Sequence, residues 1–140
     1  MSFFIKAFAI LFVSFIVLDF VWLGYIAKPF YLSQFSKIGR IEDGEFKIIY
    51  WAGAAVYIFM SIAIIYFVLP RIGVDDSIAW IFAKGALFGL CAYGIYDFTN
   101  YATLKDWTIP LTLADIAWGT FLCGAVTSIY KMLAGIVDLN

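Results

Sequence analysis

The sequence contains no histidine, and it has only two cysteines, with 9 basic and 10 acidic residues among 140. The absence of histidine removes the commonest metal ligand and general base, and it excludes histidine-based triads and haem ligation by histidine. Cys91 and Cys123 lie within apolar runs and form no CxxC motif, so we expect packing thiols rather than a redox pair. Because the formal net charge is −1, the chain lacks the basic surface typical of nucleic-acid-binding proteins.

Apolar residues dominate instead, since 65% of the chain is hydrophobic and 21% is aromatic. A soluble domain must cover its surface with polar groups and is therefore only about 45–50% apolar. The excess is arranged in runs of about twenty residues or more, which is long enough to cross a bilayer. We therefore predict an all-α membrane protein, a single domain over residues 1–140, built as a bundle of four transmembrane helices in a lipid bilayer.

The limits of the helices follow from local sequence signals. Pro29 and Pro70 end the first two spans, because a residue that precedes proline avoids helical geometry. Ser77 and Thr108 can cap the last two helices with their side-chain oxygens. An N-terminal apolar run can also be a cleaved signal peptide, but this run is too long and lacks a small-residue cleavage site. The predicted spans cover about residues 3–27, 47–69, 77–103 and 108–133.

Residues 28–46 form the only sizeable connection in this scheme. Apolar residues alternate there with Lys28, Lys37 and Arg40, which predicts a short interfacial segment between helices 1 and 2. A membrane-surface anchor is the favoured interpretation, and a lid over a site is the alternative. Basic residues are divided almost evenly between the two sides, so they do not set the orientation. The short tails favour both termini in the cytoplasm.

Three aspartates, Asp19, Asp97 and Asp115, lie inside predicted spans. A carboxylate in hydrocarbon is rare and usually faces a bundle interior, a partner or a water-filled cavity. The helical rise places the three at depths of about 12, 9 and 12 Å from the side that carries the long loop. Because independent acids need not share a depth, we expect these side chains to converge on one polar pocket.

Each acid is followed three residues later, on the same helix face, by Trp22, Asn100 or Trp118. Other polar and aromatic residues lie nearby on the third helix or at matching depth on the second, where Tyr57 also lies. The alternative is that the acids only join helices by hydrogen bonds. Such bonds average about 0.6 kcal/mol in membranes, whereas a charged aspartate at mid-membrane costs about 2.5–3.5 kcal/mol. This imbalance favours a functional pocket, predicted to contain Asp19, Trp22, Tyr50, Trp51, Tyr96, Asp97, Thr99, Asn100, Asp115 and Trp118.

Three carboxylates a few ångströms apart cannot all ionise unless positive charge compensates them. That charge can be a proton, a cationic substrate or a basic side chain from the loops. It can also be a hard metal ion such as Mg²⁺ or Ca²⁺ bound by Asp19, Asp97 and Asp115, although no residue pattern specifies a metal site. No bound cofactor is expected. The aromatic residues suit a cationic head group, through cation–π attraction, or an apolar chain.

Gly85 and Gly89, with Gly94 beyond them, form a smooth stripe on the third span. Small residues at this spacing allow two helix backbones to approach closely. Packing within the bundle is the favoured interpretation, and a homodimer through the Gly85/Gly89 face is the alternative.

Four segments, spread over essentially the full length, carry a family resemblance: Leu18–Asp19 with Trp22–Gly24, Phe30–Tyr31, Gly94 with Tyr96–Leu104, and Leu113–Thr120. On these residues the chain resembles DUF2177, a family of small bacterial membrane proteins without an assigned function. The resemblance implies a four-span protein of the bacterial inner membrane. It transfers no reaction and no catalytic residues.

Three classes of function remain open. The first is a buried acidic and aromatic pocket that binds or transports a cation, a proton or a small amphipathic ligand. The second is an integral-membrane enzyme that acts on a lipid or isoprenoid by aspartate acid–base catalysis, which a lateral opening at the depth of Asp19 would favour. The third is a non-catalytic subunit whose acids meet a basic residue of another membrane protein. The pocket is the preferred hypothesis, and enzymatic activity is left undecided.

Overall fold

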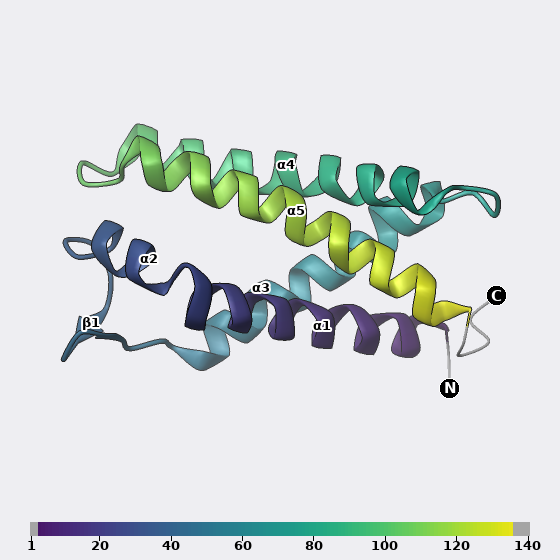
Figure 1. Cartoon of the computed structure of the whole chain (residues 1–140), viewed down its shortest axis with the longest axis horizontal. Coiled ribbons are helices and arrows are strands. Elements are labelled where there is room, and N and C mark those ends of the chain that lie inside the picture. The colour runs from purple at the N-terminus through teal and green to yellow at the C-terminus, as the bar shows by residue number, and fades with distance from the viewer. Residues whose placement is uncertain (1–2, 136–140) are drawn as a thin grey trace.

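The computed structural model describes residues 3–135, a bundle of long helices with a small hairpin at one end (Figure 1). Its elements are α1 (Phe3–Val21), α2 (Lys28–Gln34), β1 (Ile41–Glu42), β2 (Glu45–Phe46), α3 (Tyr50–Ala63), α4 (Ile78–Thr103) and α5 (Ile109–Ala134). A π-helical turn extends α1 over Trp22–Ile26, and a second one extends α3 over Ile64–Val68 before the 3-10 turn Leu69–Arg71.

Within residues 3–135, four helices are long and apolar enough to cross a membrane: Phe3–Ile26, Tyr50–Arg71, Ile78–Thr103 and Ile109–Ala134. The predicted all-α membrane fold is therefore confirmed. The two predicted caps are also present, because Ser77 and Thr108 accept hydrogen bonds from the backbone N–H groups of Trp80 and Leu111 at 3.3 and 3.2 Å. Each proline falls within the first turn of a short helical segment, Pro29 in α2 and Pro70 in the 3-10 turn.

The connection between the first two spans contains both α2 and the β1–β2 hairpin. Asp43 and Gly44 have positive φ values of 51° and 76°, as the primed turns of two-residue hairpins require. The Lys47 N–H donates to the Arg40 carbonyl oxygen at 2.8 Å, which prolongs the pairing beyond the strands. This pairing holds the chain extended, so the second span begins at Tyr50 and the predicted start at residue 47 is wrong.

The helices α4 and α5 run antiparallel and lie side by side (Figure 1). A Cβ atom at Gly85 would overlap Thr127 and the Cys123 carbonyl, and one at Gly89 would overlap Cys123 and the Gly119 carbonyl. The two glycines therefore allow close approach within the chain, which is the role that the sequence favoured. Because α5 occupies the Gly85/Gly89 face, a homodimer would need another surface.

The apolar core fills the end of the bundle where α1 begins and α5 ends (Figure 1). Side chains from α1, α5 and the Ile64–Val68 turn meet there, and its fully buried members include Leu11, Phe15, Ile64, Leu122 and Val126. Cys123 belongs to this core, whereas Cys91 is exposed on α4, and both thiols are free. A smaller cluster at the opposite end joins Ala27 and Tyr31 to Trp107 and Leu111.

Candidate functional site

The register of α4 against α5 places Asp97 opposite Asp115. Contacts between the two helices step by four residues along each, at Gly85–Thr127, Gly89–Cys123 and Tyr93–Gly119. One more step toward the loop end pairs Asp97 with Asp115, and these carboxyl groups lie close enough to form a hydrogen bond. The same packing that brings glycines together at one end therefore brings two acids together at the other.

This carboxyl pair has few hydrogen-bond donors. Asp97 is 0% exposed, and neither of its carboxyl oxygens accepts a hydrogen bond from a donor among the described residues. Ionised carboxylates are acceptors only, so a bond between Asp97 and Asp115 requires a proton on one of them. The geometry therefore suits a pair that holds one proton between two helices.

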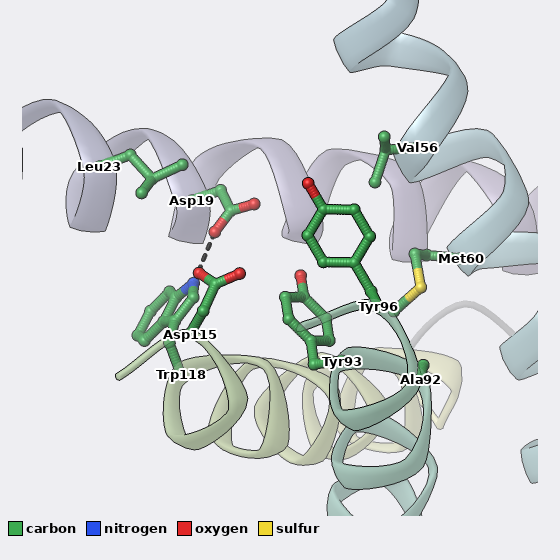
Figure 2. Close-up of a pocket in the computed structure, with 9 residues that line it drawn as sticks. All are labelled: Asp19, Leu23, Val56, Met60, Ala92, Tyr93, Tyr96, Asp115 and Trp118. Atoms are coloured by element: carbon green, nitrogen blue, oxygen red, sulfur yellow. Dashed lines mark hydrogen bonds between the residues drawn. The ribbon is translucent and has the colours of Figure 1, made fainter. Parts of the chain in front are cut away.

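Asp19 approaches from α1 and is 6% exposed. Its carboxylate accepts the Tyr57 hydroxyl at 2.8 Å from α3 and the Trp118 indole N–H at 2.6 Å from α5, the latter drawn in Figure 2. Trp22 stacks on Trp118 with ring centroids 4.4 Å apart and an interplanar angle of 7°. The two D-x-x-W motifs therefore contact each other. Trp118, from the motif that begins at Asp115, donates a hydrogen bond to Asp19, which begins the other motif.

Tyr31 connects the interfacial helix α2 to the acids. It is 4% exposed, and its hydroxyl donates to Asp115 Oδ1 at 2.7 Å. Burial and the neighbouring Asp115 carboxylate both raise the pKa of Tyr31, so the hydroxyl keeps its proton and acts as a donor. A second bond, from Thr108 to Gln34, also joins α2 to the start of α5. These two bonds join α2 to α5 at the end of the bundle that holds the acids.

A cavity of about 350 Å³ lies beside these acids (Figure 2). Its lining residues come from all four long helices or the turns that extend them: Asp19, Leu23, Val56, Met60, Ala92, Tyr93, Tyr96, Asp115 and Trp118. Figure 2 shows the two carboxylates close together, with the hydroxyls of Tyr93 and Tyr96 directed toward α1. Apart from these polar groups the wall is formed by aliphatic and aromatic carbon atoms.

On α3 and α4 the lining of the cavity reaches the surface of the bundle. Val56 on α3 and Tyr96 on α4 line the cavity and are 52% and 55% exposed on the outer surface of the bundle. Further along the second span, the Ile64–Val68 turn that follows α3 contacts α4. Val56 and Tyr96 both lie within helices long and apolar enough to cross a membrane, so we expect this side of the cavity to face lipid.

The structure brings most of the predicted pocket residues together. Asp19, Tyr96, Asp115 and Trp118 line the cavity. Three further residues lie next to it without lining it: Trp22 through its stack on Trp118, Asp97 through the carboxyl pair, and Asn100 through its contact with the Tyr96 hydroxyl.

Three predicted pocket residues lie elsewhere. Tyr50 and Trp51 are 83% and 77% exposed in the first turn of α3, as in the aromatic belts at membrane surfaces. The α3 residues that line the cavity, Val56 and Met60, lie further along the helix. Thr99 is exposed on α4, and its carbonyl accepts the Thr103 hydroxyl.

Other residues contribute although the sequence did not place them in the pocket. Tyr93 lies one helical turn before Asp97, and its ring fills the space above Gly119. Tyr31 stands in one of the segments that carry the family resemblance, and Tyr57 lies at the depth of the acids. The sequence offered a reason to notice each of these three tyrosines. It did not show which faces of the helices contact one another.

The predicted sources of compensating positive charge have little support among residues 3–135. No group of three or more histidine, cysteine, aspartate or glutamate side chains is placed there to hold a metal ion. The ion pairs in this range join Lys28 to Glu45, Lys47 to Glu42 and Lys84 to Asp76, and none reaches the three acids.

Comparison with known proteins gives one match. A family model described as a predicted membrane protein (DUF2177) matches residues 4–132. No curated protein and no solved structure matches the chain.

Proposed function

The chain belongs to the DUF2177 family of predicted membrane proteins, and we propose that it binds, within the bilayer, an amphipathic molecule with a positively charged head group. The observation that carries the proposal is the cavity, which combines two carboxylates with apolar walls and a lining that reaches the surface of the bundle on α3 and α4. Its volume lies at the lower end of the range of about 300–1,000 Å³ that is usual for small-molecule sites.

The charge of the head group follows from the polar groups around the cavity. Asp19 and Asp115 are both at its polar end, and no ion pair within residues 3–135 neutralises them. Burial of uncompensated carboxylates in a membrane is unfavourable, so a cation is the complementary ligand. The rings of Tyr93, Tyr96 and Trp118 add cation–π attraction, which contributes about 0.5–2 kcal/mol per contact.

The apolar part of the ligand follows from the remaining walls. Leu23, Val56, Met60 and Ala92 offer no hydrogen-bonding side chains, so an alkyl chain suits this part of the cavity. Where the lining reaches the surface on α3 and α4, such a chain would extend into the surrounding lipid. A molecule that is already dissolved in the bilayer could enter by this route without crossing water.

Photocrosslinking in lipid nanodiscs tests this proposal. The probe is a dodecyl chain with a diazirine and a trimethylammonium head group, and a dodecanol analogue with the same diazirine is the neutral control. We expect saturable labelling at Val56, Met60 or Ala92 by the cationic probe, at least about tenfold stronger than by the alcohol, which corresponds to about 1.4 kcal/mol.

Two matched substitutions complete the test. Asp19→Asn should reduce labelling strongly, whereas Asp75→Asn, in the exposed turn before α4, should leave it unchanged. Equal labelling by both probes, or labelling spread evenly over the lipid-facing surface and indifferent to Asp19→Asn, would contradict a cationic binding site.

The exposure of the lining on α3 and α4 also supports a second candidate, an enzyme that acts on a lipid or isoprenoid. Asp97 and Asp115 form a carboxyl pair of the kind that donates and accepts protons in acid–base catalysis. Incubation with an extract of bacterial lipids, followed by mass spectrometry, distinguishes the two candidates. A product that forms with the native protein and not with Asp115→Asn would favour the enzyme, and an unaltered lipid profile would favour binding alone.

A further inference from the structure

We infer that the Asp97–Asp115 pair holds one proton and releases it when a cationic head group binds in the cavity, an inference that rests on the proposed function. The consequence is an exchange of one proton for one cation. Such an exchange would make ligand binding depend on the proton concentration.

Asp115 connects the cavity to the buried carboxyl pair. Asp115 lines the cavity and also faces Asp97 across the α4–α5 interface, whereas Asp97 does not line the cavity and is fully buried. A head group in the cavity can therefore contact Asp115 but not Asp97. Asp115 is a member of the pair that also lines the cavity, so occupancy of the cavity can change the state of the pair directly.

Asp97 accepts no hydrogen bond from the described residues, which favours a proton on the pair. Asp19 accepts two hydrogen bonds and Asp115 accepts one, but the oxygens of Asp97 accept none from the described residues. An isolated buried carboxylate is strongly unfavourable, whereas a carboxylic acid bonded to the neighbouring carboxylate satisfies both groups. The empty cavity therefore favours one shared proton.

Among residues 3–135, no basic side chain interacts with the pair. The titratable groups that face it are Asp19 from α1, Tyr31 from α2, and Tyr93 and Tyr96 from α4. From α3, Tyr57 contacts Asp19 rather than the pair. These groups are acids or neutral hydroxyls, so none of them can replace a lost proton with a positive charge.

The exchange balances in charge and in atoms. Before binding, the pair consists of one carboxylic acid and one carboxylate. On binding, the acid O–H bond breaks, the proton passes to water outside the bundle, and two carboxylates face one cationic head group. The net charge of the pair together with its ligand is unchanged, so cation binding does not add charge to the low-dielectric interior.

Proton release measured with a pH-indicator dye in weakly buffered nanodiscs tests the inference. Dodecyltrimethylammonium is the probe, because a quaternary ammonium group has no proton of its own to release. We expect about one proton per bound probe and an apparent affinity that rises up to about tenfold per pH unit while the pair is protonated. Dodecanol should release none.

Asp97→Asn is the informative variant, because its amide can donate to Asp115 without a titrating proton. Photocrosslinking should still label this variant, and both the proton release and the pH dependence should disappear. If this variant does not fold, the stoichiometry of the native protein decides alone.

The possible outcomes are distinguishable. Saturable labelling without proton release, or equal release from Asp97→Asn and the native protein, would overturn this inference and leave the binding site intact. Absence of saturable labelling would overturn the binding site and the inference together.

Discussion

The interface between α4 and α5 has two ends that share one register and differ in chemistry. At one end Gly85 and Gly89 lie against Thr127 and Cys123 with no room for another atom. At the other end, two further steps along the same register, Asp97 faces Asp115 next to a cavity. Close packing at the glycines fixes the distance between the helices, and this fixed distance holds the two acids together.

The comparison separates stability from function within one pair of helices. The glycine end is surrounded by the apolar core, so its role is to hold the bundle. The acidic end is where tyrosine and tryptophan side chains from α2, α3 and α5 donate to the carboxylates of Asp19 and Asp115. Changes at the first end should therefore alter the free energy of unfolding, and changes at the second should alter mainly ligand and proton binding.

Adding one methyl group at the tight end should have the largest effect on stability. In Gly89→Ala the new Cβ would overlap the Gly119 carbonyl and Cys123, and we expect a loss of about 1–3 kcal/mol in the free energy of unfolding. Unfolding in mixed micelles with increasing dodecyl sulfate measures it. Gly94→Ala is the matched control, because nothing lies within 4 Å of its Cβ and it should be neutral or slightly stabilising. Equal losses in both variants would contradict the proposed packing.

Removal of one donor should have an intermediate effect. Trp118→Phe removes the indole N–H that Asp19 accepts and should lower the free energy of unfolding by about 1 kcal/mol. Trp22→Phe is the control, because the Trp22 N–H donates to none of the carboxylates among the described residues. The same unfolding assay compares them, and a larger loss in Trp22→Phe would show that ring stacking, rather than the hydrogen bond, is the main interaction.

Release of α2 from the acidic end should have a smaller effect. Tyr31→Phe removes the bond to Asp115, which contributes about 0.6 kcal/mol if it is typical of interhelical bonds in membranes. Hydrogen exchange followed by mass spectrometry should show faster exchange in Lys28–Gln34 and little change in α4. Tyr25→Phe, at a side chain that is 70% exposed, should change neither. Unaltered exchange in Tyr31→Phe would mean that apolar contacts alone hold α2.

The smallest effect concerns the turn before α4, outside both ends of the comparison. Hydrogen bonds from Lys84 and from the Gly73 N–H lower the pKa of Asp76 below its ordinary value of 3.8. A lowered pKa stabilises the fold above the unfolded-state pKa, and that contribution disappears as the pH falls through the folded-state value. The native protein should therefore lose slightly more stability below about pH 4 than Asp76→Asn. Identical profiles would contradict this assignment.

Much of the fold follows from local sequence features. The apolar runs, the prolines and the caps at Ser77 and Thr108 are local signals, and they gave four spans with limits close to those observed. The counted depths of Asp19, Asp97 and Asp115 rest on helix rise alone, and the structure places these residues around one end of the bundle. Local signals were sufficient for the spans and the caps.

The rest depended on contacts between distant residues. Tyr31 and Asp115 are separated by 84 positions, and the α4–α5 register is set by the packing of glycines rather than by any feature of the acids. The hairpin depends on a pairing too short to give a periodic signal.

A double-mutant cycle between Asp97 and Asp115 tests most directly whether the α4–α5 register couples the two acids. Stabilities of the native protein, Asp97→Asn, Asp115→Asn and the double variant give the coupling free energy. Residues in contact couple by about 0.5–3 kcal/mol, and we predict a value in that range. Additivity within about 0.3–0.5 kcal/mol, as for residues that do not touch, would contradict the pair and the pocket built around it.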